Sequence, residues 1–321
     1  DSMAPSISLS TWVWIILGYY IIATMLPIDK LIGNLYPIFG FALIAMALGL
    51  FGAVLVGDYT IPEVTLKNFQ LNPRSLPIVP TLFITIACGA ISGFHATQSP
   101  LMARCMGNEK ECRSVFYGAM ISESVIALIW AAVAMAFFGG ARELGEALAA
   151  HGGSASWAVD AISTGMLGTL GGILALLGVV VAPITSGDTA FRSLRLTIAD
   201  FLKSDQKPIG KRLLVCIPIF ALAFFCCKMD FSTVWNYVGI TNQILAVLVL
   251  WTSAAFLISR GKPHWMCSVP ATFLTFVCVS YFFMAPIKNG GLHLAPVAGY
   301  VAGIVAALAL LTFCIIRARR R

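Results

Sequence analysis

The chain has 321 residues, of which 59% are hydrophobic and only 11% charged, and its mean hydropathy is +0.89. An ordinary soluble domain carries about 25% charged residues, so this composition excludes a soluble globular protein and indicates a polytopic membrane protein. The net charge of +7 would suit a partner such as nucleic acid. The basic residues are instead distributed as a membrane topology requires, and we expect no nucleic-acid partner.

Apolar runs long enough to cross a bilayer recur along the whole chain, since a crossing helix takes about 20 residues. A β-barrel would show alternating segments of roughly ten residues, and the sequence has no such alternation. The predicted fold is therefore all-α and polytopic, one transmembrane domain with about nine helices. The predicted spans are 9–26, 35–56, 80–103, 114–139, 166–188, 211–227, 233–258, 264–285 and 294–316.

The basic residues also predict an orientation. If the C-terminus is cytoplasmic and the helices alternate, the outside loops hold few cations, as the positive-inside rule requires. Of the 21 Lys and Arg residues, those outside are Lys67, Arg74, Arg142, Lys228 and Lys288. Nine crossings then place Asp1 outside. Because the chain does not begin with Met and has no signal peptide, we expect an upstream membrane segment.

Two loops have helical apolar spacing. The outside loop 140–165 predicts a short surface hairpin that could close as an external lid. The inside loop 187–210 predicts an interfacial amphipathic helix whose Arg and Lys residues lie on the other faces. The apolar positions are Leu144, Leu148, Val159 and Ile162 in the first loop, and Phe191, Leu194, Ile198 and Leu202 in the second.

The third predicted span contains the polar stretch SGFHATQSP, residues 92–100. Unpaired polar groups are costly in hydrocarbon, and Gly93 and Pro100 weaken the helix. Secondary transporters build substrate sites from such interrupted helices. The alternative is a kinked helix that packs through Gly89 and Gly93. The predicted substrate-binding residues here are Gly93, Phe94, His95, Thr97, Gln98 and Ser99.

A second polar patch, APITSGDTAFRS at 182–193, interrupts the fifth span. Pro183 and Gly187 disfavour a regular helix, and oxygen ligands with one carboxylate suit a proton or a small hard cation. The alternative is that the SGD sequence caps the following helix. The predicted coupling residues are Thr185, Ser186, Asp188 and Thr189.

Two weaker candidates lie in other spans. Glu123 is a carboxylate inside an apolar run, and such groups are functional candidates by default; it could equally pair with a buried donor. Asn242 and Gln243 follow Gly239 in NYVGITNQILAVLVLW. They predict either a polar contact with the broken helices, as part of the substrate site, or ordinary interhelical hydrogen bonds.

Catalytic and metal signatures are missing from the sequence. It has no HExxH, GxSxG or Walker-type motif, and its four histidines are scattered. The nine cysteines form no CxxC pair and are expected to be reduced, buried thiols. We therefore expect neither an enzyme nor a metal site, and no cofactor beyond a coupling proton or Na⁺.

Four stretches together resemble the carbon starvation protein A (CstA) family of inner-membrane transporters. They cover most of the chain, and SGFHATQSP with SGDTAFRS is a specific combination. The resemblance implies uptake of peptides or pyruvate across the bacterial inner membrane, driven by a proton or another cation gradient. The stretches are LPIDKLIGNLYPIFG, SGFHATQSPLMARCMGNEKECRSVFYGAMISESVIALIW, ITSGDTAFRSLRLTIADFLK and DFSTVWNYVGITNQILAVLVLW.

This family is grouped with the amino acid–polyamine–cation transporters, whose core is two inverted five-helix repeats. In that frame the helix with SGFHATQSP resembles core helix six, and the helix with SGDT resembles core helix eight. Core helices one to three would then be absent from this chain. In the family, these helices include a Gly-rich, His-containing broken helix. The resemblance implies that this helix completes both the substrate site and the coupling-ion site.

The predicted function is thus secondary active transport of a small nutrient by alternating access. A membrane receptor or sensor that binds the nutrient without moving it is the alternative, and a channel is a third interpretation. The sequence leaves the substrate, the coupling ion and the oligomeric state open.

Overall fold

The computed structural model describes residues 9–25, 36–63, 77–86, 92–229 and 231–319. All regular structure in these ranges is helical, which confirms the predicted all-α class. The chain divides into two compact units, Asp1–Leu66 with Leu101–Lys228 and Lys67–Pro100 with Met229–Arg321. We call them unit 1 and unit 2, and each is described by itself.

Seven helical runs in the described residues are long and apolar enough to cross a membrane. They lie on seven of the nine predicted spans. The other two spans differ. The first is the shorter apolar helix Ser10–Thr24. The third is divided into the helices Ile78–Thr85 and Gly93–Cys105, and the polar stretch 92–100 is helical from Gly93 on, with Pro100 inside the second helix. The membrane-protein class is therefore confirmed by the helices themselves.

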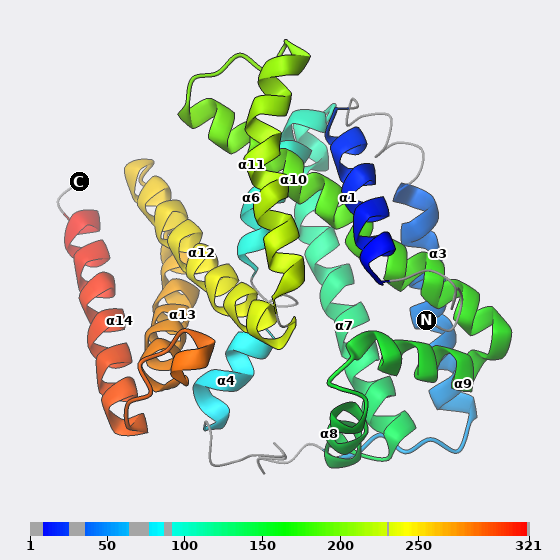
Figure 1. Ribbon diagram of the computed structural model, residues 1–321. Coiled ribbons are helices and arrows are strands. Elements are labelled where there is room, and N and C mark those ends of the chain that lie inside the picture. Colours follow the sequence, from blue (N-terminus) through cyan, green and yellow to red (C-terminus); the bar gives the residue numbers. More distant parts are fainter. Residues whose placement is uncertain (1–8, 26–35, 64–76, 87–91, 230, 320–321) are drawn as a thin grey trace. The chain divides into compact units, whose positions relative to one another are not determined.

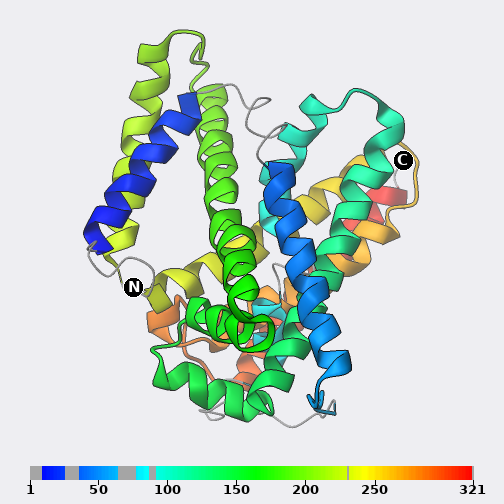
Figure 2. The ribbon, with the colours of Figure 1, turned by 90° about the vertical axis from the view of Figure 1, so that its right-hand side faces the viewer.

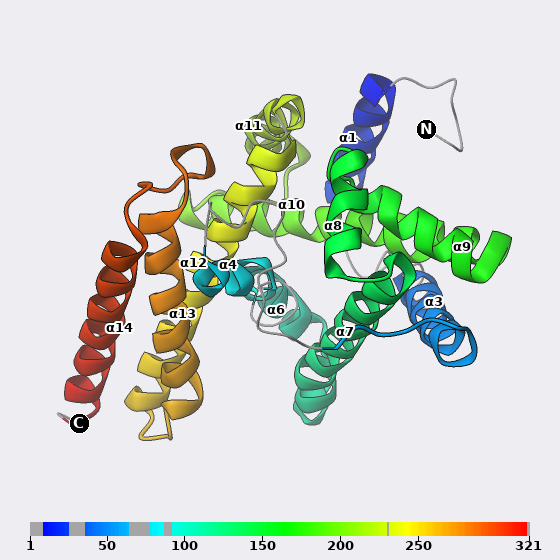
Figure 3. The same cartoon turned by 90° about the horizontal axis from the view of Figure 1, so that it is seen from below.

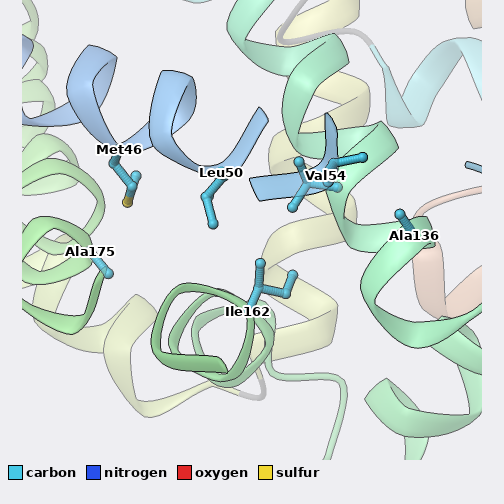
Figure 4. Close-up of a cluster of buried hydrophobic side chains, with 7 residues drawn as sticks. Met46, Leu50, Val54, Ala136, Ile162 and Ala175 are labelled. Carbon is cyan, nitrogen blue, oxygen red and sulfur yellow. The ribbon is translucent and has the colours of Figure 1, made fainter. Parts of the chain in front are cut away.

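Unit 1 is built around α3, α7 and α9. Its core joins Met46 and Leu50 of α3 to Ile162 of α9, and these side chains are almost completely buried. Figure 4 shows Leu50 and Ile162 pointing toward one another. The elements of this unit are α1 (Leu9–Met25), α3 (Tyr36–Val56), η1 (Glu109–Glu111), η2 (Arg113–Gly118), α7 (Ala119–Phe138), α8 (Ala141–Ala150), α9 (Ala155–Ala175), η3 (Leu176–Val180), α10 (Val181–Phe201) and α11 (Ile209–Lys228).

The predicted hairpin at 140–165 is formed by α8 and the first turns of α9. Ser154 caps α9 by accepting a hydrogen bond from the Trp157 amide at 3.2 Å. The second arm is longer than predicted because α9 continues to Ala175. It kinks at Gly168, whose φ of +61° is a conformation that glycine adopts without steric cost.

Helix α1 packs against α10 and α11 within unit 1, and Figure 2 shows α1 (blue) alongside α11 (yellow-green). The contact is aromatic: the Phe191 ring on α10 lies 5.0 Å from the Tyr20 ring of α1 and 4.9 Å from the Phe220 ring of α11. Gly187 allows the close approach, since a Cβ there would lie 2.6 Å from Tyr20 Cζ. The polar patch of α10 is thereby held against α1.

Helix α10 departs from two predictions. It is a continuous α-helix from Val181 to Phe201 that follows directly on the π-helical turn η3, so Pro183 and Gly187 do not break it. Asp188 lies two turns inside the helix, so the interpretation of SGD as an N-cap is wrong.

The predicted amphipathic pattern of the same segment is also wrong. Arg192 and Arg195 are only 5% and 4% exposed, whereas Leu194 is 43% exposed. The buried face of α10 therefore carries three of its charged residues, Asp188, Arg192 and Arg195.

Unit 2 consists of α12, α13 and α14 with three shorter helical elements. Figures 1 and 3 show α13 beside α14. Glycines make this contact close: a Cβ on Gly303 would meet the Ser280 hydroxyl and would lie 2.8 Å from the Phe276 carbonyl oxygen. The elements are α4 (Ile78–Thr85), the first part of α6 (Gly93–Cys105), α12 (Phe231–Ser259), α13 (Trp265–Met284), η4 (Ile287–Asn289) and α14 (Pro296–Arg319).

Candidate substrate and coupling sites

The candidate substrate site is the point in unit 2 where one predicted span is divided. Helix α4 ends at Thr85 and α6 begins at Gly93 (Figure 1); Gly89, part of the alternative packing surface, lies outside the described residues. A helix end leaves four backbone groups without partners inside the helix. In a membrane these groups must be satisfied by protein or ligand, so the division demands polar partners.

Asn242 of α12 supplies a partner at the beginning of α6. Its Oδ1 accepts hydrogen bonds from the Phe94 amide at 2.9 Å and from the Ser92 hydroxyl at 3.0 Å. The Phe94 amide also donates to Ser92 Oγ at 3.1 Å. Asn242 thus acts as a helix cap from another helix, and Gly93 leaves room for it because a Cβ there would lie 2.6 Å from Leu245 Cβ.

Gln243 supplies the partner at the end of α4. It is 1% exposed, and its Nε2 donates to the Phe83 carbonyl oxygen at 3.2 Å. Phe83 is in the last turn of α4, where carbonyls lack partners inside the helix. The Oε1 of Gln243 is buried and has no hydrogen-bond partner in the described part of the chain.

The remaining predicted substrate residues lie on α6. Thr97 and Ser99 donate to backbone carbonyls of their own helix, those of Phe94 at 2.8 Å and His95 at 2.7 Å. Gln98 differs, because its Nε2 is buried and has no partner among the residues that the structure describes. The structure therefore brings Gly93, Phe94, Asn242 and Gln243 together and leaves Gln98 as the unpaired donor on α6.

The candidate coupling residues lie on α10 in unit 1. Asp188 is completely buried, and its Oδ1 lies 3.6 Å from Nη2 of Arg192 on the next turn. The same Nη2 donates to the Ala23 carbonyl oxygen of α1 at 2.6 Å. Asp188 is thus held by a buried cation, and the pair joins α10 to the C-terminal end of α1.

The hydroxyl residues of this patch have different surroundings. Thr189 donates to the Ser186 carbonyl at 2.9 Å and lies 3.4 Å from the Thr185 carbonyl. Ser186 is exposed and lines a groove of about 430 Å³, together with Pro183 and with Trp130 of α7.

Glu123 is also in unit 1 and is exposed on α7. It lies one turn before Ile126, which lines the groove beside Ser186. In the described residues no cluster of three or more His, Cys, Asp or Glu side chains is arranged to hold a metal ion.

Sequence reasoning missed two residues of these sites. Ser92 lies at the start of the quoted stretch and takes part in the capping of α6. Arg192 was expected only on a face away from the apolar positions, although the spacing of Asp188, Arg192 and Arg195 places all three on one side of a helix. The Asp188–Arg192 spacing of i, i+4 within a largely apolar segment was the signal that could have identified it.

Comparison with known proteins identifies the family. The family model described as carbon starvation protein CstA matches residues 2–164 and 141–281. The chain belongs to the CstA family. The resemblance read from the sequence motifs is therefore confirmed, and the chain is a membrane protein of a family whose named members are transporters.

Several relatives are similar to this chain. An uncharacterized membrane protein of Haemophilus influenzae is 44% identical over 159 residues, which are 44% of this chain and 43% of that protein. The peptide transporter CstA of Helicobacter pylori is 25% identical over 335 residues, 83% of this chain and 48% of that protein. The pyruvate/proton symporter BtsT of Escherichia coli is 32% identical over 124 residues, 37% of this chain and 17% of the symporter.

The chain spans about half the length or less of these relatives. No solved structure matches it.

Proposed function

We propose that this chain belongs to a secondary active transporter that imports a small nutrient, pyruvate or a peptide, by alternating access in the bacterial inner membrane, with its C-terminus in the cytoplasm. The observation that carries the proposal is the divided helix α4–α6, held by Asn242 and Gln243 within an apolar unit. Interrupted helices of this kind form the substrate sites of secondary transporters. The names of the CstA and BtsT relatives support the same class.

The chemistry of the divided helix suits a substrate with a carboxylate, which pyruvate and peptides share. The positive end of a helix dipole favours an anion, and Gln98 adds a buried N–H donor that lacks a partner in the described residues. His95 and Thr97 lie in the same turns of α6 and are half-buried. We assign these groups, with Gly93 and Ser99, to the substrate.

The coupling ion is assigned to the α10 patch, with Asp188 as the titratable or cation-binding group and Ser186 at the groove. Substrate and ion are coupled because each stabilises the same conformation, so that binding of one raises the affinity for the other. The α8–α9 hairpin is assigned to closure from outside.

The test is uptake of labelled pyruvate and of a labelled dipeptide into proteoliposomes that contain the complete gene product. A transporter accumulates substrate saturably when a proton or Na⁺ gradient is imposed, and loses accumulation when an ionophore collapses that gradient. Binding without accumulation would replace the proposal by a receptor. Uncoupled, non-saturable flux would replace it by a channel.

A further inference from the structure

An apolar groove lies on unit 2, between α12 and α14. Its volume is about 350 Å³, within the usual size of ligand sites. Trp251, Ala255 and Ile258 line it from α12, and Leu310 and Phe313 line it from α14. Both sets recur at helical spacing, so the groove follows the long axis of two helices that are long enough to cross a membrane.

One end of this groove is basic. Ser259 and Arg317 both line it, so the C-terminal ends of α12 and α14 meet there. Arg260 follows Ser259 directly, with its guanidinium carbon 5.5 Å from the centre of the Phe256 ring. Lys262 is two residues further along, and the sequence continues after Arg317 with Arg319, Arg320 and Arg321.

This positive charge has no acidic counterpart in the same part of the chain. From Phe231 to Arg321 the sequence contains no Asp or Glu. A cluster of cations at the end of membrane helices attracts anionic lipid, at about 1 kcal/mol for each Lys or Arg near the surface. The positive-inside rule assigns this end to the cytoplasmic leaflet.

We propose that the groove binds an anionic phospholipid, with an acyl chain along α12 and α14 and the headgroup phosphate paired with Arg317 and Arg260. The apolar length of the groove favours a lipid over a free phosphate, which would use only the basic end. A second copy of the chain in a two-fold arrangement would bring the same uncompensated cations together. The occupant is therefore the lipid.

The test is native mass spectrometry of the full protein in detergent, titrated with phosphatidylglycerol or with phosphatidylcholine of the same acyl chains. We expect phosphatidylglycerol adducts on the wild-type protein. Loss of two cations in Arg260→Gln/Arg317→Gln weakens them by at least about tenfold. The matched control is Arg104→Gln/Arg142→Gln, which removes two exposed arginines of unit 1 and leaves the adducts unchanged.

A second variant tests the acyl chain separately. Ala255 is exposed in the groove, so Ala255→Leu fills part of it while all cations remain. We expect fewer lipid adducts on Ala255→Leu than on the wild-type protein. We also expect that added inorganic phosphate does not displace the lipid from the wild-type protein. Equal binding of both lipids, unchanged adducts in the Arg260→Gln/Arg317→Gln variant, displacement by phosphate, or a lipid-free dimer would each overturn the proposal.

Discussion

Asn242 and Gln243 are neighbours on α12, and their side chains hold the two ends of one divided helix. Asn242 Oδ1 accepts from the Phe94 amide at the start of α6, at 2.9 Å, and Gln243 Nε2 donates to the Phe83 carbonyl at the end of α4, at 3.2 Å. One turn of one helix thus satisfies a donor and an acceptor that a continuous helix would satisfy internally. The division of the span is built into the fold of unit 2.

Removal of this pair should destabilise unit 2. Gln243→Leu leaves the Phe83 carbonyl without its donor, and Asn242→Leu leaves the Phe94 amide with only Ser92. Each loss should cost about 1–3 kcal/mol, the usual penalty for an unsatisfied buried group. The measurement is the Tm of the detergent-purified protein.

Thr241→Ala is the control for these variants, because Thr241 is exposed and its hydroxyl bonds only to its own helix. Its Tm should equal that of the wild type. If Gln243→Leu and Asn242→Leu also retained the wild-type Tm, the two amides would not hold the helix ends.

Gly93→Ala should displace the start of α6 from α12. The added Cβ would meet the Asn242 carbonyl oxygen and would lie 2.6 Å from Leu245 Cβ. We expect a lower Tm and a loss of uptake. Gly40→Ala, at an open position on α3, should be neutral or slightly stabilising, by up to about 1 kcal/mol. A Gly93→Ala variant with the Tm and uptake of the wild type would refute the close contact.

The buried pair on α10 allows stability and coupling to be separated. Asp188→Asn removes the carboxylate that neutralises Arg192, and breaking a buried pair from one side costs about 3–5 kcal/mol. Asp188→Asn/Arg192→Met removes both charges and should restore much of the Tm. If Asp188 is the coupling group, uptake by the double variant no longer responds to the gradient; a normal gradient response would exclude that role.

The contact between α13 and α14 predicts a further effect on stability. Gly303→Leu inserts a side chain where the Phe276 carbonyl oxygen and the Ser280 hydroxyl leave no space, so overpacking should cost about 1–3 kcal/mol or more. Gly18→Leu, at an open position on α1, is the comparison. Equal Tm values for the two variants would contradict the close packing of α14 on α13.

The all-helical membrane class followed from the sequence because hydrophobic length alone decides it. The polar stretch 92–100 predicted an interruption of its span, and the span is interrupted, but before the stretch: residues 93–100 are helical and Pro100 lies inside α6. The regular course of α10 could not be predicted in the same way. Pro183 and Gly187 are helix breakers by propensity, yet packing of Gly187 on Tyr20 and of Phe191 between α1 and α11 keeps the helix regular.

The burial of Arg192 shows the same limit. The apolar pattern predicted Arg192 on a face other than the buried one, but its position one turn after Asp188 and its bond to the Ala23 carbonyl place it inside unit 1. That bond joins residues 169 positions apart in the sequence, and no local sequence pattern predicts it. The capping roles of Asn242 and Gln243 could likewise not be predicted, because they depend on the tertiary contact of α12 with the start of α6 and the end of α4.

The central claim, that the divided helix is the substrate site, is tested most directly by substrate protection of a cysteine at Gln98. Gln98→Cys is treated with a maleimide with and without pyruvate or a dipeptide, and modification is read at the peptide level so that native cysteines do not interfere. Thr252→Cys, exposed on α12, is the control. The account predicts that one of these substrates slows modification at position 98 and leaves position 252 unchanged; equal rates at position 98 with and without either substrate would contradict it.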